Sequence, residues 1–173
     1  KAAGHYKLAA QNVRRSTLRV VQGYGQHLER AGKTEEAREL YNTYLKENPE
    51  SVVLGPALAR LNKGQKPALL VSTPAQGIAE ALFNVAGTMT RQNSAQTALI
   101  YGQLALHLRP DFDLARMLVA GILESMNRNG DAIAEYRDIV PTSPFYWSAR
   151  LRIAGNLEAL DRDDAAIELL QKL

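Results

Sequence analysis

The chain has 173 residues, of which 46% are hydrophobic and 23% are charged, the composition of a folded protein rather than of a disordered tail. It contains no cysteine, which excludes disulfides, thiolate catalysis, iron–sulfur clusters and cysteine-rich zinc sites. The net charge of +3 does not favour a duplex-binding protein, and no run of about 18 apolar residues predicts a transmembrane helix.

The first 33 residues are the most basic part of the chain, with seven lysines and arginines against a single acid, Glu29. Such a run usually forms a solvated face, and contact with an acidic partner is the alternative. Residues 87–173 hold nine basic and eleven acidic side chains, so the charge pattern predicts no nucleic-acid partner. Residues 1–16 fall where the second helix of a preceding repeat belongs, and we expect them to be its remnant.

A period of 34 residues organises much of the remaining sequence. Six-residue segments that begin at Asn93, Asn127 and Asp161 match one another without gaps, and residues 32–37 match them upstream. Each segment ends in an alanine, and a proline follows that alanine by twelve residues in three of the four units. These recurring positions are Ala37, Ala98, Ala132 and Ala166, with Pro49, Pro110 and Pro144. Self-similarity at such a period predicts a repeat architecture.

Each unit has apolar residues at helical spacing on both sides of a polar turn, which predicts a helix hairpin. In the first unit Leu18, Val21 and Leu28 precede the turn, and Leu40 and Tyr44 follow it. A small residue recurs in the first helix of every unit, and an aromatic residue lies four positions after the alanine in two units. These positions are Gly25, Ala86, Ala120 and Ala154, with Tyr41 and Tyr136.

The units resemble the tetratricopeptide repeat family, whose 34-residue hairpin carries this small residue, alanine, aromatic and closing proline. The sequence departs from the family pattern at the early tryptophan position, which is occupied by Val21, Leu82, Arg116 and Arg150. The resemblance implies an all-α, right-handed superhelical solenoid of antiparallel helix hairpins. Residues 75–83 are also similar to a segment of alphaproteobacterial multi-repeat proteins of this family, which implies a bacterial protein.

One unit departs from the period, since Ala37 and Ala98 are separated by 61 residues rather than by 68. Its first helix is predicted at about 54–61, with Ser51 as a possible cap and Pro56 as either a kink or the first turn. Residues 64–76 include two prolines and predict a loop in place of the second helix. The apolar residues 69–71 either cover the gap left by that helix, or the loop blocks a binding groove.

The expected organisation is therefore one array over residues 1–173. It consists of a remnant helix at 1–16, a repeat at 18–50, a degenerate repeat at 51–78 with a loop at 64–76, repeats at 79–112 and 113–146, and a truncated repeat at 147–173.

The sequence carries no recognisable catalytic motif. His5, His27 and His107 are far apart and lack metal-ligand spacing, and neither a phosphate-binding loop nor a nucleophile elbow is present. Asp161 and Asp163 lie at a predicted helix start, where acids interact favourably with the helix dipole. We therefore predict no enzyme, no cofactor and no metal for this chain.

The resemblance implies that a ligand binds in the concave groove lined by the first helices. The groove residues that it implies are Gln22, Gln26, Glu29, Phe83, Asn84, Gly87, Leu114, Met117, Leu118, Gly121, Glu124, Leu151, Gly155 and Glu158. The family's carboxylate clamp for chaperone tails is matched only at Asn84, so such tails are not the expected ligand.

Three of these residues, Gly87, Gly121 and Gly155, occupy one repeat position in the middle of a helix, where glycine costs about 1 kcal/mol relative to alanine. Either a ligand lies against the helix there, or neighbouring helices pack too closely for a side chain.

Apolar side chains form the second feature of the expected groove, and they predict a solvent-facing strip that marks a contact surface. The strip consists of Phe83, Leu114, Met117, Leu118 and Leu151. With glutamates at one edge, it predicts a peptide or helix with apolar anchors and a basic flank.

The predicted function is a noncatalytic protein–protein interaction scaffold that binds a peptide or helix. One alternative is a structural or self-associating segment of a longer protein. Another is an accessory domain of an enzyme whose catalytic part lies outside these residues. The partner, the compartment and the oligomeric state do not follow from the sequence.

Overall fold

The computed structural model describes residues 17–173, so the remnant helix expected at 1–16 lies outside the described residues. The described residues form helices joined by turns and loops, which confirms the predicted all-α fold of helix hairpins. The described residues divide into two compact units, residues 17–70 and residues 71–173, and each is described by itself. A single array over the whole chain stays a prediction.

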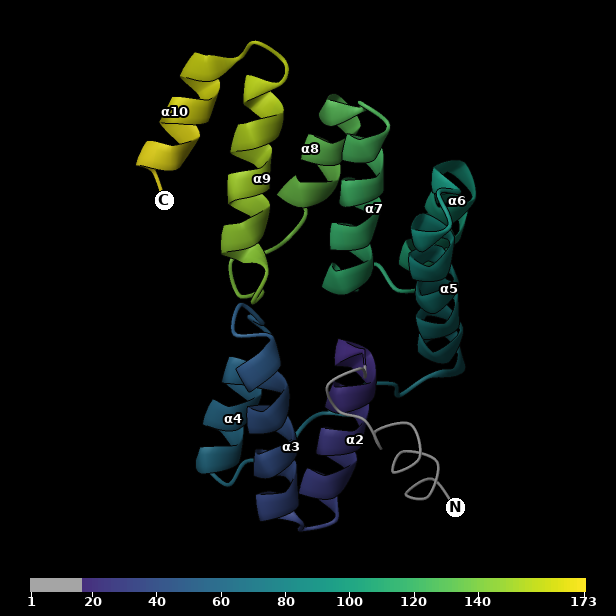
Figure 1. The fold of residues 1–173 in the computed structure, drawn as a ribbon, viewed down its shortest axis with the longest axis vertical. Coiled ribbons are helices and arrows are strands. Elements are labelled where there is room, and N and C mark those ends of the chain that lie inside the picture. Colours follow the sequence, from purple (N-terminus) through teal and green to yellow (C-terminus); the bar gives the residue numbers. More distant parts are fainter. Residues whose placement is uncertain (1–16) are drawn as a thin grey trace. The chain divides into compact units, whose positions relative to one another are not determined.

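The first unit contains α2 (Leu18–Arg30), α3 (Thr34–Glu47) and α4 (Leu54–Asn62), shown in purple to blue in Figure 1. Helix α3 packs against both α2 and α4. Their apolar faces meet in one core built around Val21, Leu28, Tyr41 and Leu54. This arrangement is a helix hairpin followed by the first helix of the next repeat.

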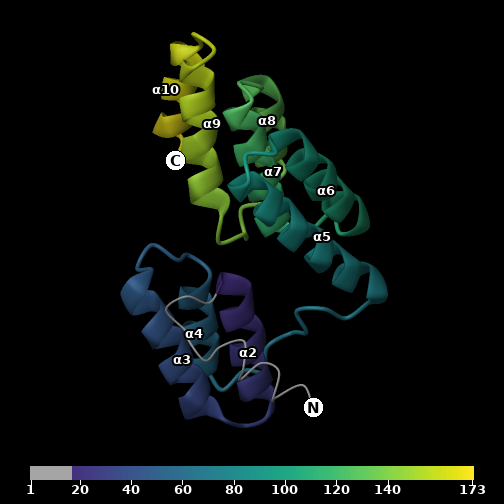
Figure 2. The same ribbon diagram turned by 45° about the vertical axis from the view of Figure 1, so that its right-hand side comes forward.

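The second unit contains three successive hairpins: α5 (Pro74–Arg91) with α6 (Ala95–Leu108), α7 (Asp113–Ser125) with α8 (Asn129–Arg137), and α9 (Tyr146–Glu158) with α10 (Asp163–Gln171). Each helix packs against the next in chain order, as Figures 1 and 2 show. One continuous core of buried residues runs from Ala79 to Ala166. We call α5, α7 and α9 the first helices of their hairpins, and α6, α8 and α10 the second helices.

The turn inside each hairpin has one repeated geometry. Gly32, Asn93, Asn127 and Asp161 all have a positive φ, between 54° and 78°. The amide of the next residue donates a hydrogen bond back to the carbonyl five residues earlier, as in Lys33 N–H to Leu28 O at 2.9 Å. This is the Schellman cap, and glycine and asparagine are the residues that reach its left-handed conformation most easily. The polar segments of the sequence therefore recur because each hairpin closes in the same way.

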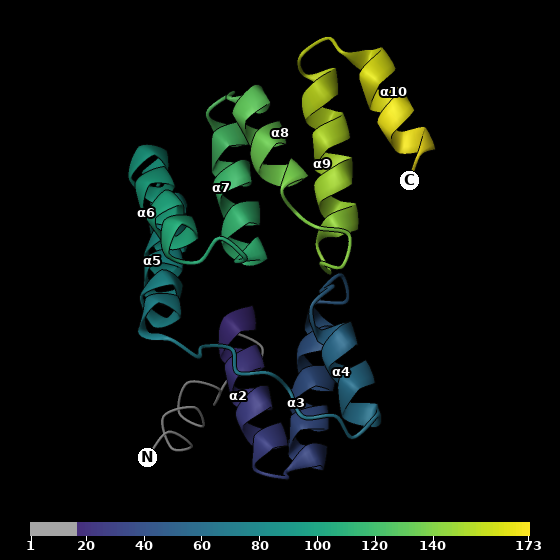
Figure 3. The same cartoon turned by 180° about the vertical axis from the view of Figure 1, so that it is seen from behind.

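Helix α4 ends with the same cap, at Gly64 with φ 65°, but no helix follows it until Pro74. Figure 3 shows this stretch as a loop. Pro67 is buried and its carbonyl accepts a hydrogen bond from Arg30 Nη1 at 3.1 Å, while Leu69 is exposed. The degenerate repeat thus keeps its first helix and its cap and lacks its second helix.

Three expectations for this region need correction. The loop expected at 64–76 ends at Thr73, because Thr73 caps α5 by accepting from Gln76 N–H and Pro74 is the first helical residue. Helix α5 therefore begins five residues before the boundary expected at 79. Ser51 does not cap α4, whose N-cap residue is Val53. Pro56 lies within the first turn of α4, which agrees with one of its two expected places.

The small residue of the first hairpin, Gly25, lies against the ring of Tyr41. A Cβ atom built on Gly25 would lie within 2.4 Å of three atoms of that ring. In the second unit Gly102, at the position equivalent to Tyr41, leaves room for Val119 of the next hairpin. Side-chain size at these positions therefore sets how closely the helices approach.

We predict that Gly25→Ala lowers the free energy of unfolding by about 2 kcal/mol, because the new methyl group must displace the buried Tyr41 ring. Gly55→Ala is the matched control in the same unit, since a Cβ there meets nothing within 4 Å. The control should be neutral or stabilising by up to about 1 kcal/mol. Urea unfolding measures both, and equal stabilities for the two variants would contradict the prediction.

Candidate functional site

The residues expected to line a groove lie on α2 in the first unit and on α5, α7 and α9 in the second. In the first unit Gln22 accepts a hydrogen bond from Arg19 Nη1 at 2.8 Å, and Gln26 is half-buried. In the second unit Asn84 is exposed and donates to the carbonyl of Glu80. Glu158 is exposed near the end of α9.

The apolar strip expected to face solvent is mostly half-buried, which corrects that expectation. Phe83 packs against Phe112 with ring centroids 5.1 Å apart, and Leu114 and Met117 pack against the core. Leu118 is also half-buried. Only Leu151, with 59% of its surface exposed, points freely outward. The other side chains lean against neighbouring helices because adjacent hairpins in a solenoid cover part of each other's surface.

The three groove glycines lie at open positions. A Cβ atom on Gly121 or Gly155 would meet nothing within 4 Å, and one on Gly87 would come no closer than 3.9 Å to the end of the Arg91 side chain. Close packing of neighbouring helices therefore does not explain these glycines, and that alternative is wrong. At this one repeated position, no side chain projects from the surface of α5, α7 or α9.

Three of the expected groove residues, Glu124, Leu151 and Gly155, line one open pocket of about 400 Å³ on α7 and α9. Asn129, Arg152, Asn156 and Ala159 complete its lining. Leu151 forms the main apolar part of the lining. The polar part consists of Glu124 at the end of α7, Asn129 at the start of α8, and Arg152 and Asn156 on α9. We call this feature the α7–α9 pocket.

Hydrogen bonds inside the α7–α9 pocket already engage the Glu124 carboxylate. The buried Asn156 side chain donates to Glu124 Oε1 and to the carbonyl of Arg152. Arg152 Nη2 lies 3.5 Å from Glu124 Oε2, and the Arg152 side chain remains 61% exposed. Glu124 therefore joins two hairpins, and its charge is not free for the basic flank expected of a ligand.

Glu124 also acts on Tyr136, which lies twelve residues later on α8. Burial, and then the negative charge of Glu124, raise the pKa of Tyr136 to about 12. The phenol therefore stays protonated at neutral pH and is buried against the core.

The same spacing occurs in the first unit, where Glu29 and Tyr41 are also twelve residues apart. Glu29 Oε1 accepts from Tyr41 Oη and from Arg60 Nη2, both at 2.7 Å, and its side chain is only 2% exposed. Burial, followed by the contact with Glu29, raises the pKa of Tyr41. Glu29 is therefore a buried link between α2, α3 and α4, and its expected place in an open groove is wrong.

Trp147 is an exposed residue that the sequence interpretation missed. It is 58% exposed and lies one helical turn before Leu151 on α9, so the two large apolar side chains share a face. Its neighbour Tyr146 packs edge-on to it and carries the Arg150 guanidinium 4.6 Å above its own ring. The sequence carries only the i, i+4 spacing of this pair of large apolar residues, and the structure shows that both are exposed.

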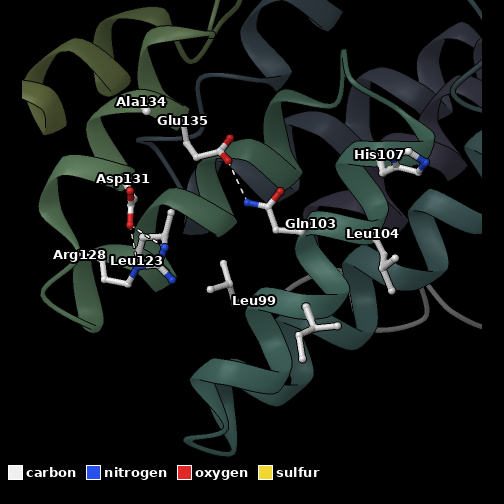
Figure 4. Close-up of a pocket in the computed structure, with 10 residues that line it drawn as sticks. Leu99, Gln103, Leu104, His107, Leu123, Arg128, Asp131, Ala134 and Glu135 are labelled. Atoms are coloured by element: carbon white, nitrogen blue, oxygen red, sulfur yellow. Dashed lines mark hydrogen bonds and ion pairs between the residues drawn. The ribbon is translucent and has the colours of Figure 1, made fainter.

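A larger open pocket of about 770 Å³ lies between the second helices α6 and α8, and Figure 4 shows its lining. Leu99, Ile100 and Leu104 supply its apolar side. Its polar rim is held by internal contacts, with Gln103 Nε2 donating to Glu135 Oε1 at 2.9 Å and Arg128 paired with Asp131. The sequence interpretation assigned nothing to this side of the hairpins.

Among residues 17–173 there is no group of three or more histidine, aspartate or glutamate side chains placed to hold a metal ion. Within the same stretch, no helix is both long enough and apolar enough to cross a membrane.

We expect Glu29→Ala to lower the free energy of unfolding by about 3 kcal/mol, because it leaves the buried Tyr41 hydroxyl and the Arg60 guanidinium without their shared acceptor. The control is Glu36→Ala, which removes an ion pair with Lys33 whose two side chains are each 54% exposed. That control should cost far less than Glu29→Ala, because an exposed ion pair contributes little to stability. Similar losses in both variants, measured by urea unfolding, would argue against a structural role for Glu29.

The raised pKa of Tyr136 predicts a loss of stability at high pH. The unfolded chain ionises near the ordinary value of 10.0 and the folded chain near about 12, so hydroxide favours the unfolded state over this interval. Below pH 10 the ionisation of Tyr136 should not change the free energy of unfolding. As the pH rises through 12, this ionisation should lower the free energy of unfolding by up to about 2 kcal/mol. Unfolding curves of the parent and of Tyr136→Phe should show a shallower fall in the variant, and parallel curves would contradict the assignment.

Comparison with known proteins gives similarity at the level of structure. No family model matches the sequence, and no curated protein matches it. A crystal structure of MamA superposes with a TM-score of 0.53 at 17% identity, over 99% of this chain and 84% of that chain. The structure of YrrB, described as a TPR protein with an unusual peptide-binding site, gives 0.51 at 14% identity over 98% and 91%.

Identities this low carry information about fold alone. The superposed structures include a tetratricopeptide-repeat protein, and the described helices follow the 34-residue hairpin with its left-handed turn and its small residue in the first helix. The chain therefore has the tetratricopeptide-repeat fold.

Proposed function

We propose that this chain is a noncatalytic protein-interaction scaffold that binds a peptide or a helix across α7 and α9. The observation that carries the proposal is the combination of the exposed Trp147 and Leu151 pair with the α7–α9 pocket beside it. Tryptophan is among the residues that most often dominate binding energy when a partner covers them. Large exposed apolar residues beside a pocket are a common mark of contact surfaces.

The open glycines support this location. Gly155 lines the pocket and Gly121 occupies the equivalent position on α7, and neither position would place a Cβ atom near another atom of the chain. A ligand backbone can therefore approach both helices closely. Glycine lowers the stability of a helix at these positions, and no contact within the chain offsets that cost. This pattern is expected where a partner supplies the contact.

The ligand class follows from the lining. Leu151 and Trp147 favour apolar anchor residues one turn or two strand positions apart, and Asn129 and the exposed Arg152 offer hydrogen-bond donors for backbone carbonyls. A peptide is therefore a better fit than a small charged metabolite. The YrrB structure is described with a peptide-binding site, and the shared fold supports the same class of ligand here.

The single tryptophan of the chain provides the test, because Trp147 is the only tryptophan and is exposed beside the pocket. Peptides selected from a random display library against the full chain should shift its fluorescence to shorter wavelength on binding. Gly155→Leu should weaken binding by about 10-fold or more, since Gly155 lines the pocket and a Cβ atom there meets nothing within 4 Å, so the new side chain takes up ligand space.

Ile100→Glu is the matched control, because Ile100 is exposed on α6 in the other pocket. It should leave the affinity unchanged. Loss of binding in Ile100→Glu but not in Gly155→Leu would move the site to the α6–α8 pocket. Peptides that bind both variants with the parent affinity would overturn the proposal.

A further inference from the structure

Helix α6 exposes a pair of large apolar side chains on its outer side. Ile100 is 61% and Leu104 46% exposed, and their i, i+4 spacing places them one above the other on the helix surface. The recurring alanine of each hairpin gives the residues that occupy the same two positions elsewhere in the chain. These are Glu39, Ala134 and Glu168 for Ile100, and Thr43, Asp138 and Lys172 for Leu104. On α6, therefore, large apolar residues replace the small, polar or charged residues of the other hairpins.

The composition of the whole of α6 agrees with this difference. Its 14 residues include no aspartate, glutamate, lysine or arginine, whereas α3, α8 and α10 each contain three or more such residues. A helix at a protein surface normally carries charged side chains on its outer side, and a helix that is apolar all round is normally buried. The composition of α6 is thus that of a helix whose outer side is covered as well.

The exposed pair lines the α6–α8 pocket, and the opposite wall of this pocket carries charges that are already paired. Arg128 Nη2 lies 2.6 Å from Asp131 Oδ2, as Figure 4 shows. Arg116 Nη1 lies 2.8 Å from Glu135 Oε2. Each acidic side chain of the lining is therefore neutralised by an arginine of the same chain, and the pocket offers apolar surface beside a wall without net charge.

We propose that two copies of this chain form a two-fold dimer through this face, with α6 packed antiparallel on α6 of the second copy. A two-fold axis that passes between Ile100 and Leu104 exchanges the two positions, so Ile100 of each copy packs on Leu104 of the other. Side chains four residues apart form the ridges that interdigitate most often when two helices pack. The short Ala134 side chain in the pocket leaves room for them beside α6. Burial of these apolar side chains in both copies supplies the driving force.

The occupant is a second copy because the face is complementary to itself. A two-fold contact brings the same patch of both copies together, so uncompensated charges of one sign would repel each other. Helix α6 brings no carboxylate, ammonium or guanidinium group to the contact. At its ends His107 of one copy lies opposite Gln96 and Thr97 of the other, whose side chains can exchange hydrogen bonds with the imidazole. A charged partner helix would find no free charge to select it.

A contact of one face with itself closes after two copies. It is isologous, so the mass of the assembly stops at that of a dimer and does not grow further. The residues that line the α6–α8 pocket do not overlap with those that line the α7–α9 pocket. Dimerisation through α6 therefore does not depend on the proposed binding of a peptide.

The test is sedimentation equilibrium of the full chain between ~10 µM and ~1 mM, where association by mass action becomes visible. The parent should approach twice the monomer mass of 19.0 kDa and go no higher. Ile100→Glu and Leu104→Lys should each raise the dissociation constant of the dimer by about 30-fold or more, because the symmetry places each change in the contact twice. Far-UV circular dichroism checks that both keep the parent helix content. Leu151→Glu, a change of the same kind at an exposed position of α9, should dimerise as the parent does.

Mixing the two α6 variants tests the antiparallel arrangement. In an equimolar mixture the introduced carboxylate of one copy lies opposite the introduced ammonium of the other, and the second apolar pair is intact. The mixture should therefore dimerise more tightly than either variant alone. A parent that stays monomeric to ~1 mM, a mass that grows beyond the dimer, or a mixture no tighter than its components would each overturn the proposal. A monomeric parent that loses stability to urea in Ile100→Glu would also overturn it, and would assign the face to a contact within the chain.

Discussion

A helix hairpin leaves one apolar face uncovered, and burial of that face by the next hairpin is the constraint on which the second unit depends. Ala115, Val119 and Ile153 are fully or almost fully buried because a preceding second helix lies over each of them. Where the preceding helix is missing, before α5, the equivalent side chains are exposed. The same constraint therefore explains why equivalent repeat positions differ in burial along the second unit.

The glutamates that join neighbouring helices are a second consequence of stacking. Glu29 and Glu124 each lie near the end of a first helix, next to a tyrosine on the following second helix and a donor on the next first helix. Each carboxylate therefore joins three helices and positions them relative to one another. Glu158 shares the repeat position, but Leu170 replaces the tyrosine and no further first helix follows within the described residues, so Glu158 remains on the surface.

Two open pockets occur on the second unit, the α7–α9 pocket and the α6–α8 pocket, and they differ in chemistry. The α7–α9 pocket combines isolated apolar anchors with open glycines and hydrogen-bond donors, which suits a peptide. The α6–α8 pocket is apolar on its α6 side, and its polar rim is held by contacts within the chain.

The sequence by itself determined the repeat period, the hairpin turns and the absence of a second helix after α4. These features depend on local chemistry, because Gly32, Asn93, Asn127 and Asp161 adopt the left-handed turn. The sequence interpretation placed Pro74 in the loop, whereas it is the first residue of α5. The Thr73 cap was missed because a threonine before a proline is equally compatible with a loop and with the start of a helix.

Tertiary structure alone decided which groove residues are exposed. The repeat register placed Glu29, Phe83, Leu114 and Leu151 on one face, but only packing shows that Glu29 is buried against Tyr41 and Arg60 while Leu151 is open. Likewise, the sequence allows two explanations for the glycines of the first helices, close helix packing or an open surface. Only the distances to neighbouring atoms distinguish the two explanations. The physical reason is that register gives the direction of a side chain from its own helix, whereas exposure depends on what the neighbouring helices place in front of it.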